Sequence, residues 1–216
     1  RDLERVIIQE GPENISAFVC ETVVGAAAGG VTPVPEYYPM IREICDKYNV
    51  VWIADEIMAG VGRAGTFLAI EHWKVQPDLV VLAKGLSSGY APLSAILVSD
   101  RVFKAFGDAK LPYIGGHTYN AHPVTAAVGL AVLDYMDRRG VIEGVAEKGH
   151  RLGEGLRAIA ERHPLVGDVR GLGLMIGVEF TAADGEPDKK TAKAVWQECI
   201  DRGLLLLTCG TYGNVI

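Results

Sequence analysis

The sequence predicts an α/β fold, with a mainly parallel sheet followed by a smaller α+β unit. Up to about Asp134, short β-rich apolar runs alternate with amphipathic stretches of helical spacing. This alternation is typical of a parallel sheet with helical crossovers. After Pro164 the pattern changes to two strands around a glycine-rich turn. We therefore expect a sheet domain over 1–134, bridging helices over 135–163 and an incomplete small domain over 164–216.

The expected strands of the sheet domain are short runs of aliphatic and β-branched residues bounded by turn residues. They cover 15–20, 50–54, 79–82 and 95–98. A first helix is expected from Asp2 to the Gly11-Pro12 pair. A second helix is expected over 36–48, because its apolar residues recur at helical spacing, and Asn49 ends it.

The elements after the sheet strands are predicted from the same signals. A helix is expected from Pro123 to Met136, since proline is tolerated in the first turn of a helix. Another is expected over 141–162, where Pro164 stops it. The remaining expected elements are strands over 169–173 and 174–180, a helix over 189–202 and a strand over 204–207.

The bulk composition excludes several classes of function. The 216 residues are 49% hydrophobic and 22% charged, as in a globular protein, and the net charge of −6 argues against a nucleic-acid surface. No apolar stretch reaches the roughly 18 residues of a membrane span, and no signal peptide is visible. Four cysteines without close pairing indicate free thiols in a cytoplasmic protein. The histidines lack the spacing of a metal site.

Both ends of the chain suggest a piece of a longer protein. The first residue, Arg1, lies inside a helical pattern, and the chain stops after Asn214-Val215-Ile216, where another strand is expected to begin.

The most informative residues are an acid and an amine at the ends of two buried strands. Asp55 follows the 50–54 run, Lys84 follows the 79–82 run, and glycines come after both. In an open α/β sheet such strand ends form a ligand site. An acid and an amine suit pyridoxal 5'-phosphate (PLP), which binds as a lysine Schiff base with an acidic partner for its ring nitrogen.

Taken singly, each residue has an ordinary alternative interpretation. Asp55 can simply begin a turn, and most lysines are surface residues. The aliphatic residues before Lys84 make a charged side chain without a function unexpected at this position. A desolvated lysine can serve as nucleophile and then as base.

Two polar loops are candidates for a phosphate site. One is 85–89, and the other is 115–119, where the Thr118 hydroxyl precedes a helix N-terminus. His117 in the second loop is either a phosphate neighbour or a structural histidine. No Walker or dinucleotide fingerprint is present, which argues against a Rossmann-type dehydrogenase.

Four motifs in order resemble one family. They are the stretch 52–65 (WIADEIMAGVGRAG), the run 77–86 (PDLVVLAKGL), the loop 116–123 (GHTYNAHP) and the run 170–174 (RGLGL). Together they resemble the class III aminotransferases, PLP enzymes of fold type I, over essentially the whole chain. The resemblance implies the second half of the large PLP domain and most of a C-terminal small domain.

The resemblance also implies a role for each matching residue. Lys84 would form the Schiff base and shuttle the proton, and Asp55 would pair with the pyridine nitrogen. Ile57 would pack on one side of the ring. Thr118 would bind the phosphate of the neighbouring subunit, which implies a homodimer or a dimer of dimers. Glu21 matches a glutamate near the site.

Departures from the family pattern bear on the substrate. Ornithine and 4-aminobutyrate enzymes carry a gating glutamate in the loop after the first strand, whereas this chain has Gly25-Ala26-Ala27. Such small residues resemble the ω-amino acid or amine:pyruvate branch. Met58 stands where several members have glutamine, and Arg63 is expected to be structural.

The implied reaction is ping-pong amino transfer from an amine or ω-amino acid to a 2-oxo acid such as pyruvate. An aminomutase or racemase of the same fold stays open, because both would keep Lys84 and Asp55. A third possibility is an inactive fragment, since the family's N-terminal phosphate loop and stacking aromatic are outside the chain. Exposed apolar surface is then expected.

Overall fold

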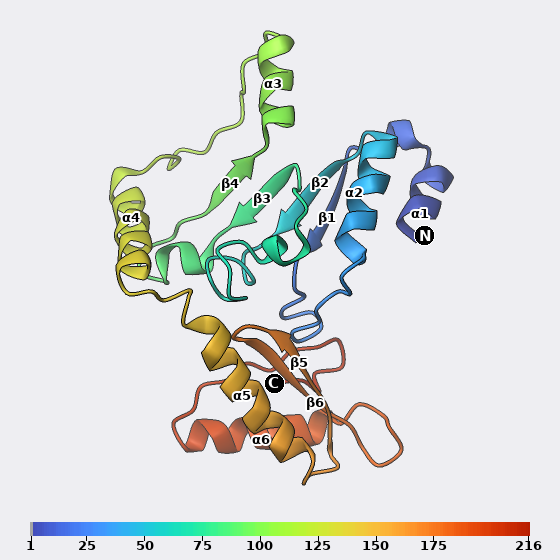
Figure 1. Ribbon diagram of the computed structural model, residues 1–216, viewed down its shortest axis with the longest axis vertical. Helices are drawn as coiled ribbons and strands as arrows, with labels where there is room; N and C mark the ends of the chain where they lie inside the picture. The colour runs from blue at the N-terminus through green and yellow to red at the C-terminus, as the bar shows by residue number, and fades with distance from the viewer. Residues whose placement is uncertain (1) are drawn as a thin grey trace.

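The computed structural model describes residues 2–216, which form two sheets with helices packed against them (Figure 1). The helices are α1 (Asp2–Glu10), α2 (Tyr37–Tyr48), α3 (Asp100–Asp108), α4 (Pro123–Arg138), α5 (Val145–Ala160) and α6 (Lys189–Asp201), with short 3₁₀ turns η1 (Pro12–Asn14), η2 (Ala69–Trp73) and η3 (Lys84–Ser87). The strands are β1 (Ala17–Glu21), β2 (Val51–Asp55), β3 (Leu79–Leu82), β4 (Ala95–Val98), β5 (Val166–Leu172) and β6 (Met175–Phe180).

The first sheet has the order β1-β2-β3-β4. The first three strands run parallel, and β4 is antiparallel to β3. The α/β fold with a mainly parallel sheet is therefore confirmed. The second sheet is the antiparallel pair β5-β6, against which α5 packs. The proposed division at residues 134 and 163 stays a prediction.

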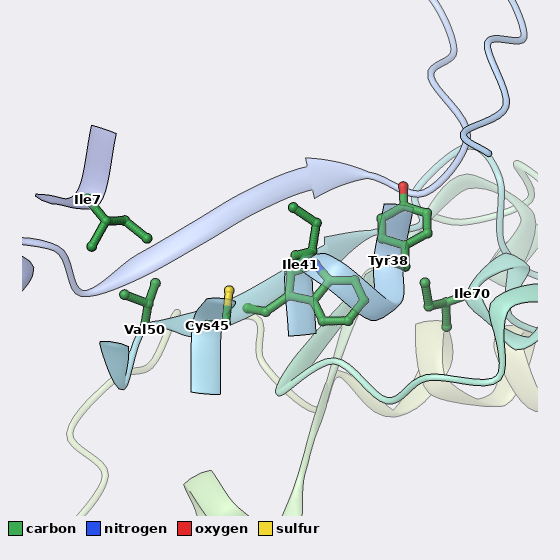
Figure 2. Close-up of a cluster of buried hydrophobic side chains, with 7 residues drawn as sticks. Ile7, Tyr38, Ile41, Cys45, Val50 and Ile70 are labelled. Atoms are coloured by element: carbon green, nitrogen blue, oxygen red, sulfur yellow. The ribbon is translucent and has the colours of Figure 1, made fainter. Parts of the chain in front are cut away.

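One face of the first sheet holds the main hydrophobic core. Trp52 and Ala54 of β2 are wholly buried on it, and Tyr38 of α2 stacks on Trp52 with ring centroids 5.4 Å apart. Figure 2 shows this core, in which α1, α2, β2 and η2 meet. Tyr38, Ile41 and Cys45 of α2 fill it, whereas Tyr37 and Met40, which the helical spacing also placed on the apolar stripe, are exposed. Burial on this face fixes how β2 lies.

The opposite face of the same sheet is bare. Register places Val19, Asp55 and Ile96 on this face, together with Glu21 and Val98. The exposed fractions of Val19, Ile96 and Val98 are 58%, 60% and 48%. Parallel sheets normally carry helices on both faces, so this surface is exceptional, and it matches the expected exposed apolar area.

A buried carboxylate fastens the ends of the parallel strands together. Glu56 is wholly buried, and its Oε1 accepts hydrogen bonds from the Thr22 hydroxyl at 3.0 Å and the Ile70 N–H at 2.7 Å. Its Oε2 accepts from the Ala69 N–H at 2.6 Å. The Glu56 N–H donates to the Val81 carbonyl at 3.0 Å. Burial raises the pKa of Glu56, although the three donors to its carboxylate oppose that rise.

A second buried carboxylate fastens the opposite end of the sheet. Asp78 accepts from the Trp52 N–H at 2.8 Å and from Nη1 of Arg42 at 3.0 Å. Its other oxygen accepts from Nε of Arg101 at 2.8 Å. Burial of Asp78 opposes its ionisation, but these three donors outweigh burial and lower the pKa of the carboxyl group.

Most element boundaries agree with the sequence, but two expectations were wrong and one helix was not expected. The 204–207 run is not a strand: Leu205 is 82% exposed, and none of the described residues pairs with the run as a strand. Helix α5 begins at Val145 rather than 141. Helix α3 was not expected; its Phe103 is 71% exposed, so burial contributes little to its formation.

Two further findings concern membrane spans and metal sites. No helix in the part of the chain that the structure describes is long and apolar enough to cross a bilayer. Residues 2–216 hold no group of three or more metal-ligating side chains.

Glu56→Gln in the full-length protein is expected to lower the free energy of unfolding. Whichever way the amide is turned, its NH₂ group faces the N–H of Ala69 or Ile70, and one buried donor loses its partner. Such a loss costs about 1–3 kcal/mol. The neutral amide escapes the desolvation cost that raises the pKa of Glu56, so we expect about 1 kcal/mol. Urea denaturation measures the change.

The matched control is Glu198→Gln, whose exposed carboxylate at the end of α6 pairs, within residues 2–216, only with Arg202. It should change the free energy of unfolding by less than about 0.5 kcal/mol. A Glu56→Gln protein as stable as the parent contradicts the anchoring role of Glu56.

Asp78→Asn is expected to lower the stability at neutral pH by about 2 kcal/mol, because two guanidinium groups and one N–H lose a charged acceptor. The folded pKa of Asp78 lies below its ordinary value of 3.8. The contribution is therefore complete above that pH and is lost as the pH falls through the folded pKa. Urea denaturation at a series of acidic pH values should show the unfolding free energies of the parent and of Asp78→Asn becoming equal only below the ordinary pKa of Asp78. A difference that already vanishes well above it contradicts this role.

Candidate active site

The register of the sheet brings three predicted site residues to one edge. Glu21 ends β1 and pairs with Asp55, which ends β2, and Asp55 pairs with Val81 of β3. Lys84 follows β3 by two residues. This edge faces the β5-β6 sheet (Figure 1). Glu21 and Asp55 also share the bare face, so the candidate site opens toward that side of the sheet.

Asp55 is half-buried and only partly used by the protein. Its Oδ1 accepts the N–H of Ile57 at 3.0 Å, which is the local turn that fixes the carboxylate as the strand ends. Within residues 2–216, no other donor reaches this carboxylate. One oxygen is therefore available to a ligand, and Ile57 lies beside it.

Lys84 combines an exposed amine with an unusual backbone. Its φ of 42° lies in the left-handed region, which a lysine adopts only when its surroundings enforce it. The following turn is held by buried Leu86 and Ser87, whose Oγ donates to the Ala91 carbonyl at 2.6 Å. Among the described residues, the Lys84 amine has no hydrogen-bond or ion-pair partner. The backbone is thus fixed while the amine is free.

Two glycines allow other segments to press against the Lys84 turn. A β-carbon on Gly85 would lie 3.1 Å from the β-carbon of Val61, so glycine permits this close approach. Val61 itself has a φ of 52°, which is rare for a β-branched residue. A β-carbon on Gly129 of α4 would meet Leu93 at 2.6 Å, beside the carbonyl of Leu86. These contacts hold the turn from behind.

Glu21 is half-buried but faces the following loop rather than Asp55. Its Oε2 accepts the N–H of Gly25 at 2.8 Å. Glu21 thus shares the edge with Asp55 through the backbone register, and its carboxylate orders the loop that begins at Gly25.

Thr118 lies apart from the other predicted residues. The loop 111–121 is exposed throughout, and within residues 2–216 no hydrogen bond joins Thr118 to Glu21, Asp55 or Lys84. The structure therefore brings Glu21, Asp55, Ile57 and Lys84 to one region but does not add Thr118. Its role toward a neighbouring subunit stays a prediction.

Two residues of the region were given no role from the sequence. Glu56 follows Asp55 and, by the alternation of a strand, faces the core; a charge at such a position signals a buried, hydrogen-bonded acid. Arg170 lies in the 170–174 motif, but its partners in the 25–30 loop are far away in the sequence. No local signal could have identified those partners.

A large apolar cavity lies outside this site. A hollow of about 780 Å³ lies between α4 and the turn at Val61–Arg63, with mostly aliphatic walls. Gly85 is part of its wall, but neither Asp55 nor Lys84 lines it. We assign the chemistry to the strand ends because the free amine and the available carboxylate oxygen are there.

The arrangement fits a ring that carries both a carbonyl and a basic nitrogen. A free amine can add to the carbonyl, and a fixed carboxylate can hold a proton on the nitrogen. Asp55 ends β2, and Lys84 begins the turn η3 two residues after the neighbouring parallel strand β3, so the sheet sets the spacing of the two residues. Lys84 and Asp55 therefore suit the predicted cofactor.

Comparisons with known proteins agree with this geometry. Residues 1–216 match the family described as aminotransferase class-III. The uncharacterized aminotransferase YodT of Bacillus subtilis (strain 168) is 39% identical over 95% of this chain and 47% of its own length. The diaminobutyrate–2-oxoglutarate transaminase of Halomonas elongata is 42% identical over 83% of this chain and 39% of its own length.

A solved structure supports the fold in the same way. An amine transaminase from an uncultivated Pseudomonas species, in its PLP-bound form, superimposes with a TM-score of 0.90 at 36% identity. All of this chain and 50% of that one are covered. The chain thus spans about half the length of the relatives it matches, and its fold is that of the fold type I transaminases. The chain belongs to the class III aminotransferase family.

Proposed function

We propose that the protein containing this chain catalyses PLP-dependent transamination between an amine or ω-amino acid and a 2-oxo acid such as pyruvate. The observation that carries the proposal is a free Lys84 amine two residues after β3 and a partly used Asp55 carboxylate at the end of the neighbouring strand β2. The relatives named as transaminases and the PLP-bound neighbour support it.

PLP, when bound, supplies an electron sink that stabilises negative charge on the substrate carbon. Lys84 would bind the cofactor covalently and then move a proton between carbon atoms, because its amine is unpaired and its backbone is fixed. Asp55 would hold a proton on the ring nitrogen with the oxygen that Ile57 does not use. Ile57 would cover one side of the ring.

The substrate class follows from the loop after β1 and from Met58. Gly25, Ala26 and Ala27 add no charge to the site, and a β-carbon on Gly25 would lie 2.6 Å from the Met58 sulfur. A wall of small and apolar side chains suits a substrate whose distal part is uncharged. This supports the amine donor, whereas an ω-amino acid donor would need a partner for its distal carboxylate outside this wall.

Assembly is proposed on the exposed 111–121 loop. Thr118 of the partner subunit would bind the cofactor phosphate, which makes the complete site a property of a homodimer or a dimer of dimers. The exposure of this loop supports the proposal, since it leaves the Thr118 hydroxyl free. The cytoplasmic location predicted from the cysteines stays a prediction.

We further propose that the remaining half of the full-length protein covers the bare sheet face. Val19, Ile96 and Val98 are more exposed than residues of a parallel sheet normally are, and Asp55 lies on the same face. A cover there would exclude water from the ring. The chain by itself would then hold the two reactive residues without a closed site.

The test of the cofactor site is reductive trapping. Full-length protein is mixed with PLP, reduced with borohydride and digested, and mass spectrometry identifies the modified lysine. We expect the label on Lys84 and its loss in Lys84→Ala, together with a fall of transaminase activity by at least about 10³-fold, because the nucleophile and the proton carrier are one group.

Lys74→Ala is the matched control, because Lys74 is also exposed and also has a positive φ, of 54°, but ends η2 away from the strand edge. It should keep both the label on Lys84 and the activity. A label that persists at another lysine in Lys84→Ala removes the basis of the proposal.

The cover is tested by comparing the 216-residue chain with the full-length protein. The chain alone should bind a dye for exposed apolar surface and should self-associate, because a bare apolar sheet face is exposed to water. The full-length protein should not bind the dye and should form no species larger than the proposed dimer or dimer of dimers. Fluorescence titration and size-exclusion chromatography measure both properties. A monomeric chain that does not bind the dye contradicts the proposed cover.

A further inference from the structure

The loop of residues 25–30 follows β1 of the first sheet and makes contact with the second sheet. It begins at Gly25, whose N–H donates to Glu21 Oε2 at 2.8 Å, and it closes on itself where the Gly30 N–H donates to the Val24 carbonyl at 2.8 Å. Glu21 is directly across from Asp55 in the sheet. The hydrogen bond from the Gly25 N–H to Glu21 therefore couples the position of the 25–30 loop to the candidate site.

Four consecutive carbonyl groups of this loop accept hydrogen bonds from the C-terminal part of the chain. Ala26 accepts from the Gly210 N–H at 3.0 Å, and Ala27 from the Thr211 hydroxyl at 3.4 Å. The next two carbonyls are both bound by Arg170 of β5. The loop is thus attached to the β5-β6 unit along its length, although it belongs in sequence to the first sheet.

Arg170 makes the most directional of these contacts. Its Nη2 donates to the Ala28 carbonyl at 2.8 Å, and its Nε donates to the Gly29 carbonyl at 3.0 Å. On its other side, Nη1 pairs with the carboxylates of Asp168 and Glu179. The side chain is only 20% exposed. Two adjacent carbonyls and two acids match the planar fork of arginine, and a lysine cannot reproduce that pattern.

The backbone of the 25–30 loop also packs directly against β6 at Gly29 and Gly30. A β-carbon on Gly177 of β6 would lie 2.2 Å from the Gly29 carbonyl oxygen, and one on Gly30 would lie 3.0 Å from the Gly177 nitrogen. Only glycines let the two backbones approach so closely. The hydrogen bonds of Arg170 therefore act on a loop already in contact with β6, so they set its orientation and not merely its proximity.

We propose that Arg170 is a positioning residue that sets the amino-donor side of the site: it fixes the 25–30 loop and, through the Gly25 N–H, the carboxylate of Glu21, the residue that pairs with Asp55 in the sheet. This inference rests on the proposed transamination. Arg170 does not touch Asp55 or Lys84. Its loss should therefore alter substrate binding more than the chemical step, and it should leave cofactor attachment intact.

Hydrogen–deuterium exchange of the PLP-loaded full-length protein gives a direct measurement of the loop. The peptide 22–31 contains the amides of Val24, Gly29 and Gly30, which are bonded within the loop. In Arg170→Ala we expect this peptide to exchange at least about tenfold faster. Arg170→Lys should show a smaller increase, because the charge stays while the fork is lost. Arg202→Ala, which removes an exposed guanidinium of α6, should show none.

Steady-state kinetics supply the second measurement. In Arg170→Ala we expect KM for the amino donor to rise about tenfold, with a smaller change in kcat, as for the loss of a charge-assisted hydrogen bond that positions a binding wall. Arg170→Lys, the milder variant, should show the same split to a lesser degree. The visible absorption of bound PLP should match the parent in both.

The results separate the two proposals. Unchanged exchange of the 22–31 peptide and an unchanged KM in Arg170→Lys overturn the positioning role, even if Arg170→Ala does not fold. An equal loss of kcat and of bound PLP also overturns it, because that pattern indicates general structural damage. If the parent protein shows no transamination, the proposed function fails, while the exchange comparison still tests whether Arg170 holds the loop.

Discussion

The register of the three parallel strands is the constraint on which the candidate site depends. Glu21, Asp55 and Val81 lie across from one another, so the side chains at these strand ends cannot move independently. A slip of one residue would turn Asp55 into the core and Glu56 onto the bare face. Glu56 prevents that slip, because its carboxylate finds three donors only on the covered side.

The same constraint explains what the sequence could predict. Asp55 and Lys84 were predictable because a charge directly after a buried strand must lie at the sheet edge. The role of Glu56 could be predicted only by knowing which residues of β2 face the core. That alternation depends on where the strand ends, which a sequence gives only to within a few positions. The antiparallel direction of β4 and the bond from Arg170 to Gly29, 141 residues away, depend on the folded chain and have no local signal. The 204–207 run shows the converse, since four leucines indicated a strand that has no neighbour to pair with in the described structure.

Lys84 shows how the fold maintains an unfavourable local conformation. A left-handed backbone at a residue with a β-carbon costs about 1–2 kcal/mol. The turn keeps it because Leu86 and Ser87 are buried on one side and Val61 presses on Gly85 from behind. These contacts surround the backbone and leave the amine free. Apolar packing therefore fixes the backbone of Lys84, and its amine stays free for the covalent role proposed for it.

The proposed chemistry and the proposed control of the substrate side thus depend on different parts of the chain, the first sheet and the β5-β6 unit. The proposed reactive pair, Lys84 and Asp55, lies at the edge of the first sheet, where an aminotransferase, an aminomutase and a racemase of this fold would all need it. The 25–30 loop belongs to that sheet in sequence, but four of its carbonyls are held by residues that follow Pro164. A change in the second unit can therefore move the loop without touching Asp55 or Lys84. Substrate choice can in this way diverge while the chemistry stays constant, which accounts for why Lys84 and Asp55 identify the cofactor more readily than the amino donor.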